Sequence, residues 1–148
     1  KATRQKKSIN SHIHWAGPDG LSGLGWSSPS IADGKVFLTT AVPQGEGLSL
    51  PVLALDAATG KTVWEKKVRA VEKAPAIHSK NSHASPTPIV HEGTVFVHFG
   101  ALGIISLAAA DGTVQWSNSD LEYTPLHGSG GSPAEPLPPP NSPTARCS

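Results

Sequence analysis

The feature that most constrains this chain is an internal repeat. Residues 28–37 (SPSIADGKVF) align without a gap to residues 87–96 (TPIVHEGTVF), at an offset of 59. Both segments begin with Ser/Thr-Pro, carry an acidic residue and Gly in the middle, and end in Val-Phe. An Asp-Gly or Glu-Gly pair between two short apolar runs predicts a β-hairpin, because Gly adopts a positive φ at little steric cost.

The second half of the unit recurs as well. Residues 53–64 (LALDAATGKTVW) align with residues 105–116 (ISLAAADGTVQW), at an offset of 52. The pattern is a strand, a Gly-containing turn and a strand that ends in Trp. The seven-residue difference between the two offsets falls in residues 41–50, which we expect to form a longer loop. Each unit therefore holds four short strands, the content of one β-propeller blade.

We predict an all-β fold, a β-propeller fragment of four-stranded antiparallel blades, with two blades at residues 28–67 and 86–117. The strands are expected at residues 29–32, 35–40, 52–56, 62–67, 87–91, 94–99, 104–108 and 113–117. Trp15 is interpreted as the closing strand of a preceding blade, and Gly131-Ser132-Pro133 as the opening of a following one. The 45 residues from Pro88 to Pro133 match the ~40–45 typical of one blade.

Residues 62–74 leave one alternative open. A short helix there would gather four apolar side chains on one face, with Glu65 and Arg69 as an i,i+4 ion pair; the four are Val63, Trp64, Val68 and Val71. The recurrence around Trp116, where Pro and Gly follow soon after, favours a strand for residues 62–67. Beyond Val68 both states remain open.

The two ends of the chain differ from its middle. Residues 1–12 hold four of the 12 basic residues (Lys1, Arg4, Lys6 and Lys7), and the rest of the chain is mildly acidic. Without interleaved aromatic residues this favours a disordered arm over an electrostatic contact with nucleic acid or anionic lipid. Residues 134–148 hold five Pro and are predicted to be a disordered Pro-rich tail. A PxxP ligand for an SH3-like domain is the alternative. The loss of the pattern after Pro133 suggests truncation or a frame change.

Two further features bear on the compartment. The chain has no apolar run of 18 or more residues, which predicts no transmembrane segment. It begins at Lys1 without an apolar signal segment, so the first residues do not indicate a compartment. Cys147 is the only cysteine, so no disulfide can form within the chain.

Residues 54–64 resemble the tryptophan-docking motif Ala-x-Asp-x-x-Thr-Gly-x-x-x-Trp of the pyrroloquinoline-quinone-repeat propellers. The first copy is complete at Ala54, Asp56, Thr59, Gly60 and Trp64. The second copy retains Gly112 and Trp116, whereas the other motif positions are Ser106, Ala108 and Asp111. The resemblance covers residues 13–133. The chain is similar to the propeller of the outer-membrane-assembly lipoprotein and to planctomycete-type propeller proteins.

The resemblance implies that each Trp packs between adjacent blades and that polar contacts fix the turn. It also implies a bacterial, periplasmic or extracytoplasmic protein. Some members of the family are quinoprotein dehydrogenases, which bind the quinone and Ca²⁺ on the propeller axis. These would need an Asp base, a cluster of calcium ligands and often a Cys-Cys pair.

This chain has no Cys pair, and its acidic residues fall mostly in turns or outer strands. We therefore expect a non-catalytic scaffold or interaction module, with no catalytic residue, cofactor or metal. Its partners would be a protein or the missing blades, not nucleic acid, and self-association is expected. The alternative is a piece of a quinone-dependent dehydrogenase, in which case the quinone would be the cofactor.

The chain has seven His. The pairs His78/His83 and His12/His14 lack further ligands at metal-site spacing. Asn81, His83 and His127 belong to loops that lead into the first strand of a blade. Such loops line one mouth of a propeller channel, so a binding role there is a hypothesis, with hydrogen bonding within the turn as the alternative.

Overall fold

The computed structural model describes residues 21–79, 81–119, 131 and 132. In this part of the chain the fold is all-β, which confirms the predicted fold class. In chain order the elements are β1 (Ser30–Ala32), β2 (Lys35–Thr39), β3 (Val42–Gln44), β4 (Gly47–Asp56), β5 (Thr62–Val71), β6 (Ile89–His91), β7 (Thr94–His98), the 3-10 turn η1 (Gly100–Leu102), β8 (Ile104–Ala108) and β9 (Val114–Asn118). The predicted arm and tail, Trp15 and His127 lie outside the described residues.

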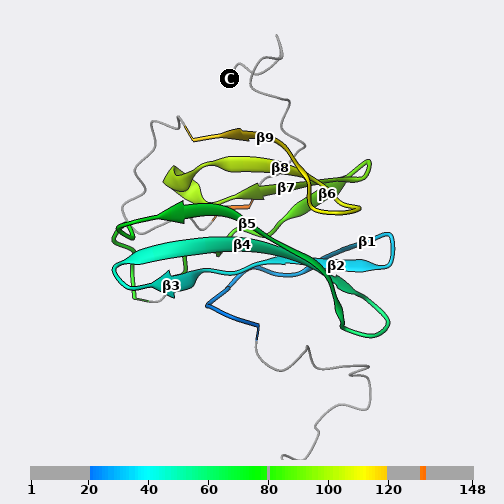
Figure 1. Cartoon of the computed structure of the whole chain (residues 1–148), viewed down its shortest axis with the longest axis horizontal. Coiled ribbons are helices and arrows are strands. Elements are labelled where there is room, and N and C mark those ends of the chain that lie inside the picture. The colour runs from blue at the N-terminus through cyan, green and yellow to red at the C-terminus, as the bar shows by residue number, and fades with distance from the viewer. Residues whose placement is uncertain (1–20, 80, 120–130, 133–148) are drawn as a thin grey trace, which may run out of the picture.

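The strands form two antiparallel sheets that lie face to face (Figure 1). In the second sheet the order is β6-β7-β8-β9. In the first sheet β1, β2, β4 and β5 follow the same order, and β3 pairs with the beginning of β4. Each sheet therefore contains the four consecutive antiparallel strands expected of one blade.

The repeated acidic-Gly pairs form the predicted hairpin turns. Asp33 and Gly34 have φ of 49° and 69°, and Glu92 and Gly93 have φ of 45° and 72°. Two consecutive positive φ values are typical of the type I′ turn, whose twist matches that of the flanking strands. The two hairpins have the same register, with Ser30 opposite Phe37 in one and Ile89 opposite Phe96 in the other.

Six of the eight predicted strands lie within two residues of their expected bounds, and the other two are longer. The prediction of a loop at residues 41–50 was wrong. These residues form β3 and the first part of β4, which are joined at Gly45 with φ of 62°. Leu48 and Leu50 are buried there, and burying such side chains stabilises a fold by about 1.5–3 kcal/mol each.

The question left open at residues 68–74 is resolved as strand through Val71. Val71 pairs with Leu48, and Val68 and Val71 pack against the core. Pro51 lies inside β4 at a register shift between Leu50 and Pro51, where its missing N–H is tolerated.

The core lies between the two sheets. Side chains on one face of β4 alternate toward the second sheet and meet side chains of β7 and β8; the buried cluster includes Leu48, Leu50, Val52, Ala54, Val95, Val97, Ile105 and Leu107. The period-2 alternation of a strand explains how β4 sends every second residue to this interface. No segment of the described residues forms a helix that could cross a membrane.

Candidate functional site

The turn after β4 is held by the Asp56 carboxylate. Its Oδ1 accepts hydrogen bonds from the Thr59 N–H and the Thr59 hydroxyl, both at 2.7 Å, and from the Ala58 N–H at 3.1 Å. The hydroxyl and amide of Thr59 lower the pKa of Asp56 below its usual value, because they stabilise the charged form. Gly60 completes the turn with φ of 73°, and its N–H donates to the Asp56 carbonyl at 2.8 Å.

The turn after β8 has the same backbone path with different side chains. The Gly112 N–H donates to the Ala108 carbonyl at 2.9 Å, and Gly112 also has φ of 73°. Ala108 stands where the first copy has Asp56, so no carboxylate is available at that position. Asp111 accepts from the Thr113 N–H at 2.9 Å instead, and this bond lowers the pKa of Asp111.

Trp64 joins the two blades. Its Nε1 donates to the Ala109 carbonyl at 3.2 Å, so a side chain of β5 is bonded to the turn of the second sheet. A Cβ atom placed on Gly112 would lie 2.7 Å from Cε3 and 2.9 Å from Cδ2 of this indole. Only a glycine therefore leaves room for the indole beside this turn. Trp64 also meets Phe37 of its own sheet, with ring centroids 6.0 Å apart and planes tilted by 51°.

Trp116 repeats the packing within its sheet. Its ring centroid lies 6.4 Å from that of Phe96, with the planes tilted by 54°. Phe37 and Phe96 are therefore repeat equivalents that the sequence analysis did not single out, although both end the Val-Phe signature. Trp64 and Trp116 are both half-buried. The repeat predicts that Trp116 or Trp15, which lacks a complete neighbouring blade in this chain, is more exposed than Trp64; this stays a prediction.

Asn81 and His83 lie in the segment between β5 and β6. Asn81 Oδ1 accepts from the Ser82 N–H at 2.8 Å and from the Ser85 hydroxyl, so this side chain is engaged in its own turn. The Ser82 hydroxyl donates to the Leu24 carbonyl at 3.1 Å and ties this turn to the start of the first blade. His83 is half-buried. Since His127 lies outside the described residues, a shared channel mouth stays a prediction.

Two histidines have lowered pKa values. Burial lowers the pKa of His98 and of His83, because a desolvated ring holds its proton less well. At His98 a hydrogen bond with the Gly131 backbone acts in the opposite direction without cancelling the effect of burial. His98 was not singled out in the sequence, because nothing in its surroundings marks it before the sheets are packed.

Acidification is expected to destabilise the fold through these two rings. The unfolded chain binds protons at His near pH 6.5, whereas the folded chain binds them only at lower pH. The stability present above pH 6.5 should therefore fall as the pH drops through the folded-state pKa values. Urea unfolding at pH 7.5 and pH 5.5 should show the decrease, and His98→Asn should reduce it. An unchanged pH dependence in His98→Asn would contradict a buried neutral ring.

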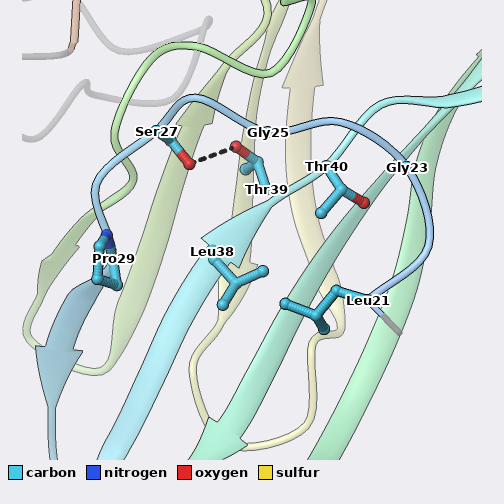
Figure 2. Close-up of a pocket in the computed structure, with 8 residues that line it drawn as sticks. All are labelled: Leu21, Gly23, Gly25, Ser27, Pro29, Leu38, Thr39 and Thr40. Atoms are coloured by element: carbon cyan, nitrogen blue, oxygen red, sulfur yellow. Dashed lines mark hydrogen bonds between the residues drawn. The ribbon is translucent and has the colours of Figure 1, made fainter. Parts of the chain in front are cut away.

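A small pocket of about 280 Å³ lies beside the end of β2 (Figure 2). It is lined by Leu21, Gly23, Gly25, Ser27, Pro29, Leu38, Thr39 and Thr40. Thr39 donates from its hydroxyl to Ser27 Oγ at 3.3 Å across one side of it. The pocket contains neither Asn81 nor His83. Among the described residues there is no group of three or more His, Cys, Asp or Glu that could hold a metal ion.

Comparisons with known proteins agree with this architecture. The family model described as outer membrane protein assembly factor BamB matches residues 5–136. A curated relative, outer membrane protein assembly factor BamB of Xanthomonas campestris pv. campestris, is 38% identical over 88 residues. That match covers 60% of this chain and 20% of the relative, so the chain spans about a fifth of its length.

Two solved structures are similar at low identity. A europium-containing methanol dehydrogenase matches with a TM-score of 0.40 and 24% identity, over 61% of this chain and 14% of that one. BamB from Moraxella catarrhalis matches with a TM-score of 0.32 and 19% identity, over 60% of this chain and 26% of that one. Because the family model matches nearly the whole chain and both sheets repeat the four antiparallel strands of one blade, the chain belongs to the BamB family of pyrroloquinoline-quinone-repeat β-propellers.

Proposed function

We propose that this chain is part of a non-catalytic scaffold that binds proteins outside the cytoplasm and contributes to the assembly of outer membrane proteins. The proposal is supported by the BamB family match and by the 38% identical relative, whose name describes that role. The main structural support is the hydrogen bond from Trp64 to the Ala109 carbonyl, which holds consecutive blades together. A rigid arrangement of blades can present its loops to a protein partner.

The experiment is a binding measurement with the purified chain. An outer-membrane β-barrel protein, diluted from urea, is passed over the immobilised chain, with an unfolded cytoplasmic protein of similar size as the control. Saturable binding of the β-barrel protein alone would support the scaffold. In parallel, the chain is loaded with pyrroloquinoline quinone and Ca²⁺ and tested for alcohol-dependent dye reduction. Dye reduction together with absent β-barrel binding would overturn the proposal in favour of a dehydrogenase fragment.

The face of the first sheet that points away from the second is proposed to receive a further blade. Ile31 is 72% exposed on this face, whereas Val90, its repeat equivalent, packs against the core between the sheets. This one strand position is thus covered in the second blade and open in the first, whereas Val36, Leu53 and Leu55 are buried in the first sheet like their repeat equivalents in the second.

Self-association of the isolated chain is the expected consequence, since an exposed large apolar side chain such as Ile31 favours contact with a second copy. Sedimentation velocity at increasing concentration should show dimers or larger species. Ile31→Lys should shift the chain toward the monomer. Gln44→Lys, which changes an exposed residue of β3, should leave the distribution unchanged. A monomer at all concentrations for the unaltered chain would contradict this expectation.

A further inference from the structure

The residue just ahead of each blade makes a contact that the docking motif does not explain. Ser28 and Thr87 are repeat equivalents, and each immediately precedes a Pro. The Ser28 N–H donates to Thr87 Oγ1 at 3.1 Å. The Thr87 N–H donates in turn to Ser132 Oγ at 2.8 Å, and Ser132 is also followed by a Pro in the sequence. The same bond therefore occurs twice, in the same direction along the chain.

The chemistry of the Ser/Thr-Pro step accounts for this bond. Pro has no N–H, so the amide of the residue before it is the last donor ahead of the strand. Because β1 begins at Ser30 and β6 at Ile89, the amides at positions 28 and 87 lie outside the ladders of their own sheets. A backbone N–H needs a partner, and the hydroxyl of the next step supplies one. An alanine or valine at position 87 or 132 has no hydroxyl group and could not accept this hydrogen bond.

Other hydrogen bonds also join the segments that lead into the two blades. The N–H groups of Trp26 and Ser27 both reach the Ala84 carbonyl, at 3.2 and 3.3 Å. The Ser30 hydroxyl donates to the Pro88 carbonyl. These bonds all join the start of the first blade to the start of the second.

A similar contact joins the second blade to the segment that follows it. The His98 ring is hydrogen-bonded with the Gly131 backbone, next in sequence to Ser132, which accepts the bond from Thr87. The starting segments of successive blades are thus bridged twice, although beyond β9 the structure describes only Ser119, Gly131 and Ser132. The repetition indicates a property of the repeat unit rather than of one loop.

We propose that the Ser/Thr-Pro steps form a directional hydrogen-bond relay between blades, in which each hydroxyl accepts the amide of the step before it. Thr87 is the central member, since it accepts from Ser28 and donates to Ser132. The relay fixes the register of one first strand on the next, at a place distant in sequence from the Trp64 contact. Because its direction is fixed, a blade that docks beside Ser28 must supply a backbone amide. A blade that docks beyond Ser132 must supply a hydroxyl group that accepts the Ser132 N–H.

The relay is tested by amide hydrogen exchange, read by NMR for each link. Thr87→Val removes the acceptor and nearly preserves the shape, so the Ser28 amide should exchange roughly three- to tenfold faster relative to core amides of β4. Thr87→Ser keeps the hydroxyl and should preserve the protection of Ser28. Ser132→Ala should accelerate the Thr87 amide and leave the Ser28 amide unchanged.

Two control variants separate the relay from general loosening. Ser28→Ala retains the backbone N–H and should leave the exchange of that amide as it is. Thr62→Val changes an exposed threonine of β5 and should affect neither amide. Equal exchange of the Ser28 amide in Thr87→Val and Thr87→Ser would overturn the relay. The relay would also be overturned if Ser132→Ala accelerated the exchange of the Ser28 amide as much as that of the Thr87 amide. This second variant tests the relay even if Thr87→Val does not fold.

Discussion

Replacing Gly112 with alanine is expected to destabilise the chain by about 2–5 kcal/mol, from two separate effects. The first is backbone strain, since φ is 73° and the left-handed region costs an L-residue about 1–2 kcal/mol. The second is overpacking of about 1–3 kcal/mol, because the new Cβ would lie 2.7 Å from Trp64 Cε3 and 2.8 Å from Lys66 Cγ. Relief would require the indole to move off the turn and lose its bond to Ala109.

The matched control for this change is Gly93→Ala. Gly93 has φ of 72°, almost the same as Gly112, but no atom lies within 4 Å of its added Cβ. This variant should carry the strain alone, about 1–2 kcal/mol. Urea unfolding of both variants, followed by circular dichroism, measures the difference. Equal losses would contradict the placement of Trp64 on Gly112, and a Trp64→Ala background should remove the excess if the placement holds.

Most of the fold could be predicted from the repeat, because its signals are local. The Asp33-Gly34 and Glu92-Gly93 pairs define their hairpins within a few residues, and the structure places each in the expected turn. The strands around these turns follow from short apolar runs of fixed spacing. Gly60 and Gly112, found by the same alignment, both have the positive φ that the turn requires.

The features that could not be predicted depend on contacts between blades. The strand pair formed by β3 and β4 replaces an expected loop, and β5 continues to Val71, because Leu48, Leu50 and Val68 reach a core that the second sheet completes. The sequence of residues 41–50 or 62–74 alone does not reveal that these side chains are buried against the second sheet.

The candidate site divides in the same way. The alignment selected Trp64 but not its acceptor, the Ala109 carbonyl, which lies 45 residues further along the chain. Backbone acceptors carry no sequence signal, so the partner becomes visible only when the blades are stacked. Asn81 was selected for the position of its loop, and the structure shows its carboxamide oxygen bonded within its own turn.

Trp64→Ala is expected to destabilise the chain by about 2–4 kcal/mol, less than the ~3–5 kcal/mol typical for a fully buried large aromatic side chain, because Trp64 is half-buried. The variant loses the contact with Phe37, the contact with Gly112 and the bond to Ala109. Trp64→Phe should keep much of the ring packing and lose the N–H donor, at about 1 kcal/mol. Calorimetry is the suitable measurement, since tryptophan fluorescence changes with the substitution itself.

Trp116→Ala provides the comparison that separates docking between blades from packing within a blade. Trp116 has the repeat-equivalent contact with Phe96, so its removal costs the aromatic pair of its own sheet. Trp64 has that pair and, in addition, the bond to the turn of the following blade. Trp64→Ala should therefore cost more than Trp116→Ala, by about 1 kcal/mol or more. If the two variants lose the same stability, the stacking of the two blades does not depend on the indole of Trp64, and the core between β4, β7 and β8 alone holds them together.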